Sequence, residues 1–176
     1  SLMIISAEEV RNYVDSDESN SMLEAKLRAL ESLIRRFTNN NFQVRAIRSR
    51  SAIMDGKILK PPPYLKQGDT VQISESLLNN GVYAVTELDE DGMTVDGELK
   101  SCVKNLITKV EYPEDIVMGV INMLKWDLNN RDKVGVQSET LSRHSVTYFN
   151  MDRDNSLIGY PKSLTDFLIP YMKARF

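Results

Sequence analysis

The stretch that decides the predicted fold is Gly68–Val85, which reads GDTVQISESLLNNGVYAV. Thr70–Ile73 alternates polar and apolar residues, as a half-buried strand does, and Val82–Val85 follows as a second strand. Between them, Asn79–Gly81 is a strong turn signal because Asn and Gly accept positive φ angles. This stretch therefore predicts neighbouring short strands joined by a turn.

Further short strands are expected on both sides of this stretch. Upstream, Gln43–Ile53 alternates loosely, and downstream, Met93–Val95 lies between two Asp-Gly turns. Leu106–Val110 closes the series, whereas Pro61–Pro63 is too stiff for a helix interior. Several short strands with glycine turns at close spacing predict a small antiparallel barrel.

Helical periodicity flanks this strand-rich region. The expected helices cover Ala7–Val14, Ser21–Asn39, a segment that begins at Pro113, and Ser163–Ala174. A capping box at Ser6–Glu9 begins the first helix, and Pro113 occupies the favoured first-turn position of the third. Pro170 should kink the last helix or end it early, because proline lacks a backbone N–H.

The order of helices, strands and helices predicts two modules. The outer helical parts are too short to bury separate cores, so we expect residues 1–44 and 112–176 to pack together as one discontinuous domain. Residues 45–111 would be an inserted β module. The predicted fold class is α+β, a small helical bundle with an inserted small antiparallel β-barrel.

Composition narrows the class of protein. The chain has 22 basic and 25 acidic residues and a net charge of -3, which argues against a general nucleic-acid binder. Its single cysteine excludes an intramolecular disulfide and fits a reducing compartment. No apolar run approaches the ~20 residues of a membrane span. No signal peptide is visible, and we interpret Met3 as the native initiator.

The sequence contains no recognisable catalytic, cofactor-binding or metal-binding motif, so we expect a protein that is not an enzyme and needs no cofactor. The single histidine, His144, lies in a polar segment, and its spacing from Ser142, Ser145 and Glu139 matches no known triad order. A hydrolase that uses His144 is the weakest interpretation. Cys102 lacks a CxxC partner or a nearby histidine.

Charge is distributed unevenly along the chain. Arg45, Arg48 and Arg50 occupy a predicted strand, where they would either form a solvated face or contact phosphate. The acidic cluster Glu87, Asp89, Glu90 and Asp91 lacks calcium-loop spacing, and it is expected at a solvated hairpin tip. An alternative function for this protein is a nucleic-acid-binding module that uses the Arg45–Arg50 strand.

Three segments together carry a resemblance to a known family. They are Met3–Arg11 with the leucine-rich helix that ends at Ile34–Phe37, then Val136–Glu139 leading into Ser145–Tyr148, and finally Gly159–Pro161 with Leu168–Phe176. Their order resembles bacteriophage head–tail connector proteins, also called adaptor or head-completion proteins, including prophage-encoded relatives from Gram-positive bacteria. The resemblance covers the helical parts. The predicted β insert looks like a small SH3-like barrel.

The resemblance implies a structural virion protein. Such proteins form a homo-oligomeric ring that docks beneath the portal protein, contacts tail or head-completion proteins, and extends the DNA channel. A subunit would be free of membranes, would let DNA pass without specific binding, and could be monomeric before assembly. It would belong at the head–tail junction of the virion, and in the bacterial host cytoplasm during assembly.

Two sets of residues are candidates for roles in such a ring. The first has strand propensity but no obvious hairpin partner nearby in the sequence, so we expect it to pair with another subunit or the portal; it comprises Ser145, Val146, Thr147, Tyr148 and Phe149. The second is the acidic cluster Glu87, Asp89, Glu90 and Asp91, a candidate for the channel lining. Acidic side chains repel passing DNA, over the ~8 Å Debye length at physiological salt.

Overall fold

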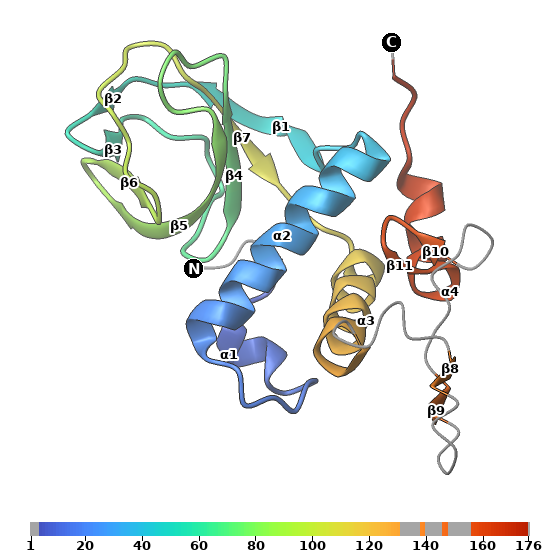
Figure 1. Cartoon of the computed structure of the whole chain (residues 1–176). Helices are drawn as coiled ribbons and strands as arrows, with labels where there is room; N and C mark the ends of the chain where they lie inside the picture. Colours follow the sequence, from blue (N-terminus) through green and yellow to red (C-terminus); the bar gives the residue numbers. More distant parts are fainter. Residues whose placement is uncertain (1–3, 131–137, 140–145, 148–155, 176) are drawn as a thin grey trace. The chain divides into compact units, whose positions relative to one another are not determined.

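Figure 1 shows a computed structural model of the chain, which describes residues 4–130, 138–139, 146–147 and 156–175. The chain divides into two compact units. The β unit comprises residues 1–6 and 41–112, and the α unit comprises residues 7–40 and 113–176. Both units are therefore assembled from two separate stretches of the sequence.

The β unit is built on one seven-stranded antiparallel sheet. Its strands, in spatial order, are β1 (Gln43–Arg50), β7 (Leu106–Val110), β4 (Thr70–Ser74), β5 (Gly81–Asp89), β6 (Gly92–Val95), β3 (Lys57–Ile58) and β2 (Ile53–Met54). Strand β4 is an inner strand, with Val71 opposite Lys109 of β7 on one side and Tyr83 of β5 on the other. The stretch Gly68–Val85 thus supplies an inner strand and much of the longest strand beside it.

Alternation along the strands builds the core of the β unit. In β4, Val71 and Ile73 are buried while Gln72 between them is half-buried, and Ile107 of β7 lies opposite Ile73. The buried cluster comprises Ile53, Ile58, Val71, Ile73, Val85, Met93, Val95, Leu99 and Ile107. Fully burying one such side chain contributes about 1.5–3 kcal/mol. A one-residue slip would turn these side chains toward water, so their pattern fixes the strand register.

The sheet is open, and the predicted SH3-like barrel is wrong. Closure requires the two outermost strands to pair with each other. Instead, β1 pairs with β7, β2 pairs with β3, and the strand order ends at β1 and β2. The physical reason lies in strand length, because β2 and β3 have only two residues each. They are too short to carry a ladder of hydrogen bonds round to β1.

Two helices dominate the α unit. In α2 (Asn20–Thr38), the buried apolar side chains are Leu23, Leu27, Leu30 and Ile34. The Ser19 hydroxyl caps its start by accepting a hydrogen bond from the Met22 amide at 3.2 Å. Asn39 ends it in the left-handed conformation. In α3 (Glu114–Asn130), the buried apolar side chains are Ile116, Val120, Ile121, Met123 and Leu124.

The predicted helical bundle is also wrong. Helices α1 (Ala7–Val10) and α4 (Lys162–Thr165) have four residues each. The final helix expected over Ser163–Ala174 is instead α4 followed by a 3₁₀ segment, η2 (Asp166–Tyr171), with Pro170 inside it. Proline cannot donate the bond that continues an α-helix. The described chain is mostly one large antiparallel sheet with a few helices rather than a bundle carrying a barrel.

The carboxyl-terminal stretch is tied to the end of α2. The Lys173 amide donates to the Thr38 carbonyl at 2.8 Å, and the Asn39 side-chain amide donates to the Ala174 carbonyl at 2.9 Å. The Asn40 side-chain amide donates to the Tyr171 carbonyl at 3.0 Å. The bond to Thr38 satisfies a carbonyl that an isolated helix end leaves unpaired.

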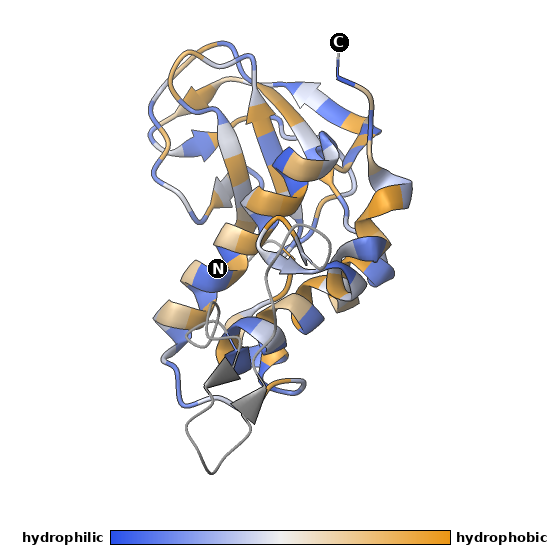
Figure 2. Ribbon diagram, turned by 45° about the vertical axis from the view of Figure 1, so that its right-hand side comes forward, coloured by the Kyte–Doolittle hydropathy of each residue, from blue (hydrophilic) through white to orange (hydrophobic). Residues whose placement is uncertain are grey.

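Apolar and polar residues alternate along the helices and strands in Figure 2, as elements with one buried face require. In the part of the chain that the structure describes, none of the helices combines the length and the apolar character needed to cross a membrane.

Two short pairs of strands complete the described fold. Strand β10 (Ser156–Leu157) pairs with β11 (Tyr160–Pro161), and β8 (Ser138–Glu139) pairs with β9 (Val146–Thr147).

Candidate interaction surfaces

The acidic residues that the sequence singles out lie together on the β5–β6 hairpin. Glu87 is opposite Thr94, and Asp89 is opposite Gly92 at the end of the ladder. The Asp89 carboxylate accepts hydrogen bonds from the Asp91 amide at 2.8 Å and the Gly92 amide at 3.1 Å. Its other oxygen accepts from the Lys57 ammonium at 2.6 Å. The Asp89 side chain therefore fixes the conformation of the hairpin tip.

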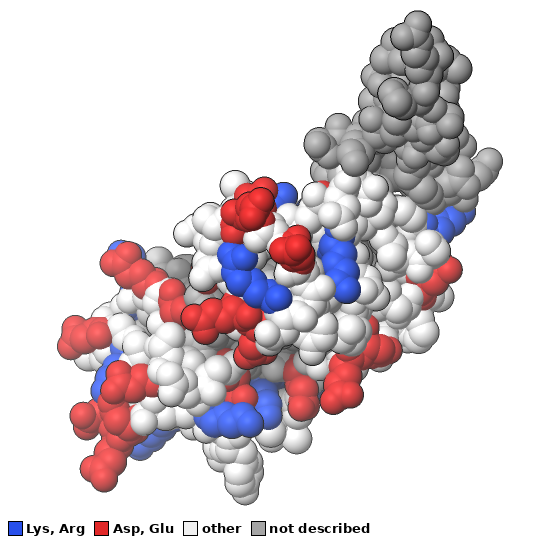
Figure 3. All heavy atoms as spheres, turned by 90° about the horizontal axis from the view of Figure 1, so that it is seen from below, with Lys and Arg blue, Asp and Glu red and all other residues white. Residues whose placement is uncertain are grey.

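Lys57 changes the electrostatics of this tip. Its hydrogen bond to Asp89 is the largest influence lowering the pKa of that carboxyl, and the two tip amides lower it further. Asp89 and Lys57 therefore neutralise each other. Glu87, Glu90 and Asp91 are exposed and take no part in the ion pairs of the described residues. Figure 3 shows acidic side chains gathered at the left-hand edge, the side on which Figure 1 places β3 and β6.

A buried polar network lies at the other end of β5, in the loops before β5 and before β7. The Asn105 side-chain amide donates to the carbonyls of Ser51, at 3.0 Å, and Cys102, at 2.8 Å. Its oxygen lies 2.6 Å from the Ser76 hydroxyl, which donates to it. The Asn79 side chain exchanges two bonds of 2.8 Å with the Lys100 backbone. These loops are consequently fixed to each other.

These two hydrogen-bonded loops present exposed apolar side chains. Leu77 is 87% exposed, Leu78 is 59% exposed, and Val103 is 77% exposed. We call these three residues the apolar loop patch. The side chains of Lys100 and Lys104, on the same loop as Val103, are exposed and form no ion pair within the described residues. The apolar loop patch is therefore a candidate surface for contact with another protein.

Sequence reasoning missed this patch, although a signal was present. Leu77-Leu78 directly precedes the turn Asn79–Gly81, where polar residues are the norm. Two adjacent leucines next to a turn cannot both face the core of a strand with a two-residue period. The sequence could not predict that these leucines lie beside the loop of Val103. This association depends on hydrogen bonds between two loops that are far apart in the sequence.

The three arginines of the alternative interpretation lie on β1, an edge strand. The register of β1 against β7 shifts between Val44 and Arg48, and Arg45 lies within this irregular stretch. Arg50 pairs with Glu75 at 2.8 Å. Arg45 and Arg48 are exposed and have no ion-pair partner in the described chain. Exposed charges on an edge strand also discourage pairing with another sheet.

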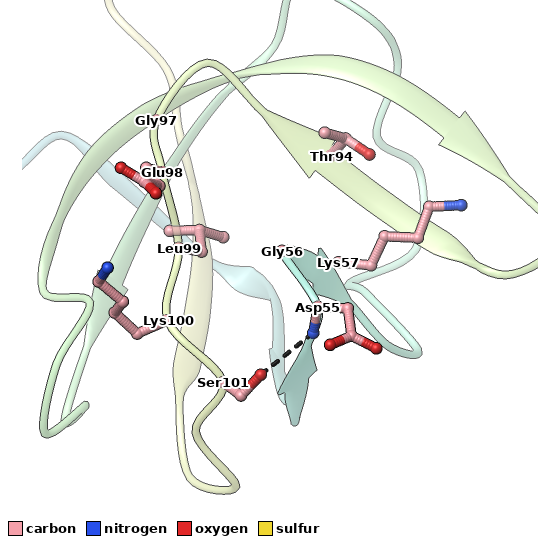
Figure 4. A pocket seen from close by; sticks show the side chains of 9 residues that line it. All are labelled: Asp55, Gly56, Lys57, Thr94, Gly97, Glu98, Leu99, Lys100 and Ser101. Carbon is pink, nitrogen blue, oxygen red and sulfur yellow. Dashed lines mark hydrogen bonds between the residues drawn. The ribbon is translucent and has the colours of Figure 1, made fainter.

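A shallow cavity of about 680 Å³ lies in the β unit. It is lined by Asp55, Gly56, Lys57, Thr94, Gly97, Glu98, Leu99, Lys100 and Ser101. Among the lining residues, the Asp55 amide donates to the Ser101 hydroxyl at 3.1 Å. Figure 4 shows the Lys57 ammonium and the Glu98 carboxylate pointing in opposite directions. The cavity therefore does not bring acid, base and nucleophile toward one point.

Groups with catalytic or metal-binding potential are scattered. Among the described residues, no three His, Cys, Asp or Glu side chains are grouped to hold a metal ion. Cys102 is free, and its thiol lies 3.6 Å from the Lys104 carbonyl. Hydrogen bonding with the loop backbone, foremost at Leu77, lowers the pKa of this thiol. His144 lies outside the described residues.

The predicted subunit-contact strand is described only in part. Val146 pairs with Glu139 and Thr147 with Ser138, in the β8–β9 ladder. The neighbouring segment thus supplies a partner, contrary to the expectation that no nearby residues would do so. Ser145, Tyr148 and Phe149 lie outside the described residues. Their contact with another subunit or with a portal stays a prediction, as does the channel-facing role of the acidic cluster.

Comparison with known proteins leaves the class open. No family model and no curated protein matches the chain.

Proposed function

We propose that this protein is a structural, non-catalytic subunit of a bacteriophage head–tail connector, which forms a ring between portal and tail and extends the DNA channel. The observation that carries the proposal is the apolar loop patch, because an exposed apolar surface on fixed loops favours protein contacts. Leu77 and Val103 are more than three-quarters exposed. A lone chain gains nothing from displaying them.

The resemblance of the opening, middle and closing segments adds the viral context. Tyr160–Pro161 of the closing segment forms β11, and Leu168 of η2 is fully buried. The last residues are hydrogen-bonded to the end of α2 through Thr38 and Asn39. The described part of the closing segment therefore belongs to the packed framework of the α unit, which suits a structural subunit.

Recruitment by a portal ring tests this function. Purified chain mixed with the portal of the same phage should co-sediment with it at about one copy per portal subunit, and electron microscopy should show an added ring. A Leu77→Ser, Val103→Ser variant should weaken this recruitment or the ring's completion while keeping the melting temperature. Absence of binding by the cognate portal would contradict the connector function.

The exposed Arg45 and Arg48 side chains favour a second candidate, a nucleic-acid-binding module. Neighbouring arginines without acidic partners suit phosphate contact. DNA affinity that falls steeply with salt, and that Arg45→Gln with Arg48→Gln lowers uniformly across sequences, would support it. The net charge of -3 disfavours it. Affinity that is undetectable at low salt would exclude it.

A further inference from the structure

Two surfaces of the β unit lie at opposite ends of one strand. Strand β5 runs from Gly81 to Asp89. The loop that carries Leu77 and Leu78 precedes it, and the tip of the acidic hairpin follows it. A strand of this length spans at most roughly 30 Å. A molecule with different surfaces at its two ends can form repeating contacts from head to tail, which close into a ring if the rotation permits.

These two surfaces are complementary in charge. The apolar loop patch is accompanied by Lys100 and Lys104, both free of ion pairs among the described residues. The hairpin tip presents three exposed carboxylates that are likewise outside those ion pairs; they belong to Glu87, Glu90 and Asp91. Opposite charges around a contact fix its register and disfavour wrong partners.

The hairpin also offers an apolar centre. Leu88 is opposite Met93 in the ladder, yet it is 37% exposed, whereas Met93 is fully buried. Acidic residues therefore flank a partly exposed leucine on the hairpin. The patch has the matching composition, with apolar side chains beside lysines. An apolar centre with a polar surround is the usual arrangement of protein interfaces.

We propose that the β5–β6 hairpin of one copy docks on the apolar loop patch of the next copy, with Leu88 against Leu77, Leu78 and Val103. The carboxylates of Glu90 and Asp91 then face Lys100 and Lys104. This inference rests on the proposed function and specifies its subunit contact. It competes with the channel-facing role predicted for the acidic cluster, because a hairpin covered by the next copy does not line a channel.

The contact is small by itself. A stable interface buries about 800 Å² per partner, and one hairpin tip offers less than that. Association of the free chain should therefore be weak and should fall with added salt, because exposed charges are screened. A test must consequently detect transient contacts between copies rather than rely on a stable complex.

Zero-length cross-linking meets this requirement, because a carbodiimide joins a carboxylate to a lysine only when they touch. Equal amounts of ¹⁴N- and ¹⁵N-labelled full-length chain are mixed, treated, digested and analysed by mass spectrometry. Mixed-isotope peptides should join Glu90 or Asp91 to Lys100 or Lys104. The 2.6 Å pair of Lys57 and Asp89 serves as the internal control and should yield links within one copy.

Variants make the outcome decisive. Leu77→Asp with Leu78→Asp should remove the links between copies and leave the Lys57–Asp89 link intact. Glu87→Lys with Glu90→Lys should remove the Asp91 links, as should Lys100→Glu with Lys104→Glu. Mixing these two charge-reversed chains should restore mixed-isotope links. In those links, a lysine introduced into the hairpin of one chain joins a glutamate introduced beside the patch of the other.

Two results would overturn this contact. One is the absence of mixed-isotope links between hairpin and patch in the wild-type chain. The other is a yield that the Leu77→Asp, Leu78→Asp variant does not reduce. Portal recruitment separates this inference from the proposed function. Recruitment without these links refutes only the contact, whereas these links without recruitment refute only the connector role.

Discussion

Gly119 of α3 lies against the ring of Phe167 in η2, so closely that a Cβ atom at position 119 would stand 2.3 Å from two ring carbons. Gly119 is buried. The absence of a side chain there allows the 3₁₀ segment to approach the helix. Glycine is a poor helix former, but at position 119 its missing side chain lets η2 pack against α3.

Gly119→Ala should destabilise the protein. Alanine in place of glycine inside a helix normally adds about 1 kcal/mol of stability, but overpacking a buried site costs about 1–3 kcal/mol. Since Phe167 lies in the path of the new methyl group, the second effect should win. Denaturant unfolding should show a lower midpoint for Gly119→Ala.

Two further variants check the cause. Asn122→Ala changes an exposed position of the same helix and should alter stability by no more than about 0.5 kcal/mol. Phe167→Leu should make Gly119→Ala less damaging than it is in the wild-type background, because the smaller side chain leaves room. Equal cost of Gly119→Ala in both backgrounds would show that Phe167 is not the obstacle.

Asn105→Ala should loosen the loops that carry the apolar loop patch. Asn105 is buried, and its removal leaves the Ser51 carbonyl without the Asn105 donor and the Ser76 hydroxyl without its 2.6 Å acceptor. The Cys102 carbonyl keeps the Ile53 amide as a donor. Unsatisfied buried polar groups cost about 1–3 kcal/mol. Unfolding experiments should show a loss of that size, and the amides of residues 76–80 should exchange hydrogen faster.

Lys104→Ala is the matched control for Asn105→Ala, because Lys104 is the exposed neighbour on the same loop. It should leave both the unfolding midpoint and the exchange rates almost unchanged. Similar effects from the two substitutions would mean that the loop depends on its general conformation rather than on the Asn105 amide.

Local patterns predicted elements better than they predicted their assembly. The leucine spacing and the Asn39 turn indicated a helix over Ser21–Asn39, and α2 spans Asn20–Thr38. Thr70–Ile73 indicated a strand, and β4 spans Thr70–Ser74. Both follow from periodicity and capping, which act over a few residues. The order of the strands does not follow from such local patterns, because β7 inserts between β1 and β4 from a distant part of the chain.

The closed barrel was predicted wrongly, and the Lys57 contact was missed, for the same reason: both depend on pairing between distant strands. Glycine turns are compatible with open and closed sheets alike, and only the two-residue lengths of β2 and β3 distinguish them. Among the predicted site residues, those of the acidic cluster are close in the sequence, and they lie together on one hairpin. Its partner Lys57 lies 32 residues before Asp89. The contact needed the β3–β6 pairing, which no local pattern reveals.

Tyr171→Phe should reduce stability on the neutral side of the tyrosine titration. The Tyr171 hydroxyl lies 2.6 and 2.7 Å from the two oxygens of the Asp115 carboxylate. Its hydrogen bond to Asp115, more than burial, raises the pKa of this phenol above 10.0. A folded-state pKa that is raised contributes stability below pH 10.0, and this stability is lost as pH rises through the folded value.

Melting curves against pH check the role of Tyr171. The wild-type chain should exceed Tyr171→Phe in melting temperature at neutral pH, and the gap should close in strong alkali. Tyr64→Phe alters a ring that is 86% exposed and should give no such gap. A gap that persists unchanged after the phenolate absorbance has developed would contradict the assignment to the Asp115 hydrogen bond.

The ion pair of Lys57 and Asp89 should stabilise the acidic hairpin within a defined pH window. Asp89 has a pKa lowered from 3.8, first by the Lys57 hydrogen bond, so its contribution is complete above pH 3.8 and is lost as pH falls through the folded value. Lys57 has a pKa raised from 10.5 by the same bond, so its contribution is lost as pH rises through the higher folded value.

The melting temperature of wild type minus that of Asp89→Asn should therefore be positive and flat between these limits, and it should shrink toward either extreme. Added salt should reduce it, because both side chains are partly open to solvent and screening weakens their attraction. Glu90→Gln is the matched control, since Glu90 lies on the same tip outside any ion pair of the described residues. An equal pH profile for both variants would attribute the effect to the net charge of the hairpin instead of to the Lys57 contact.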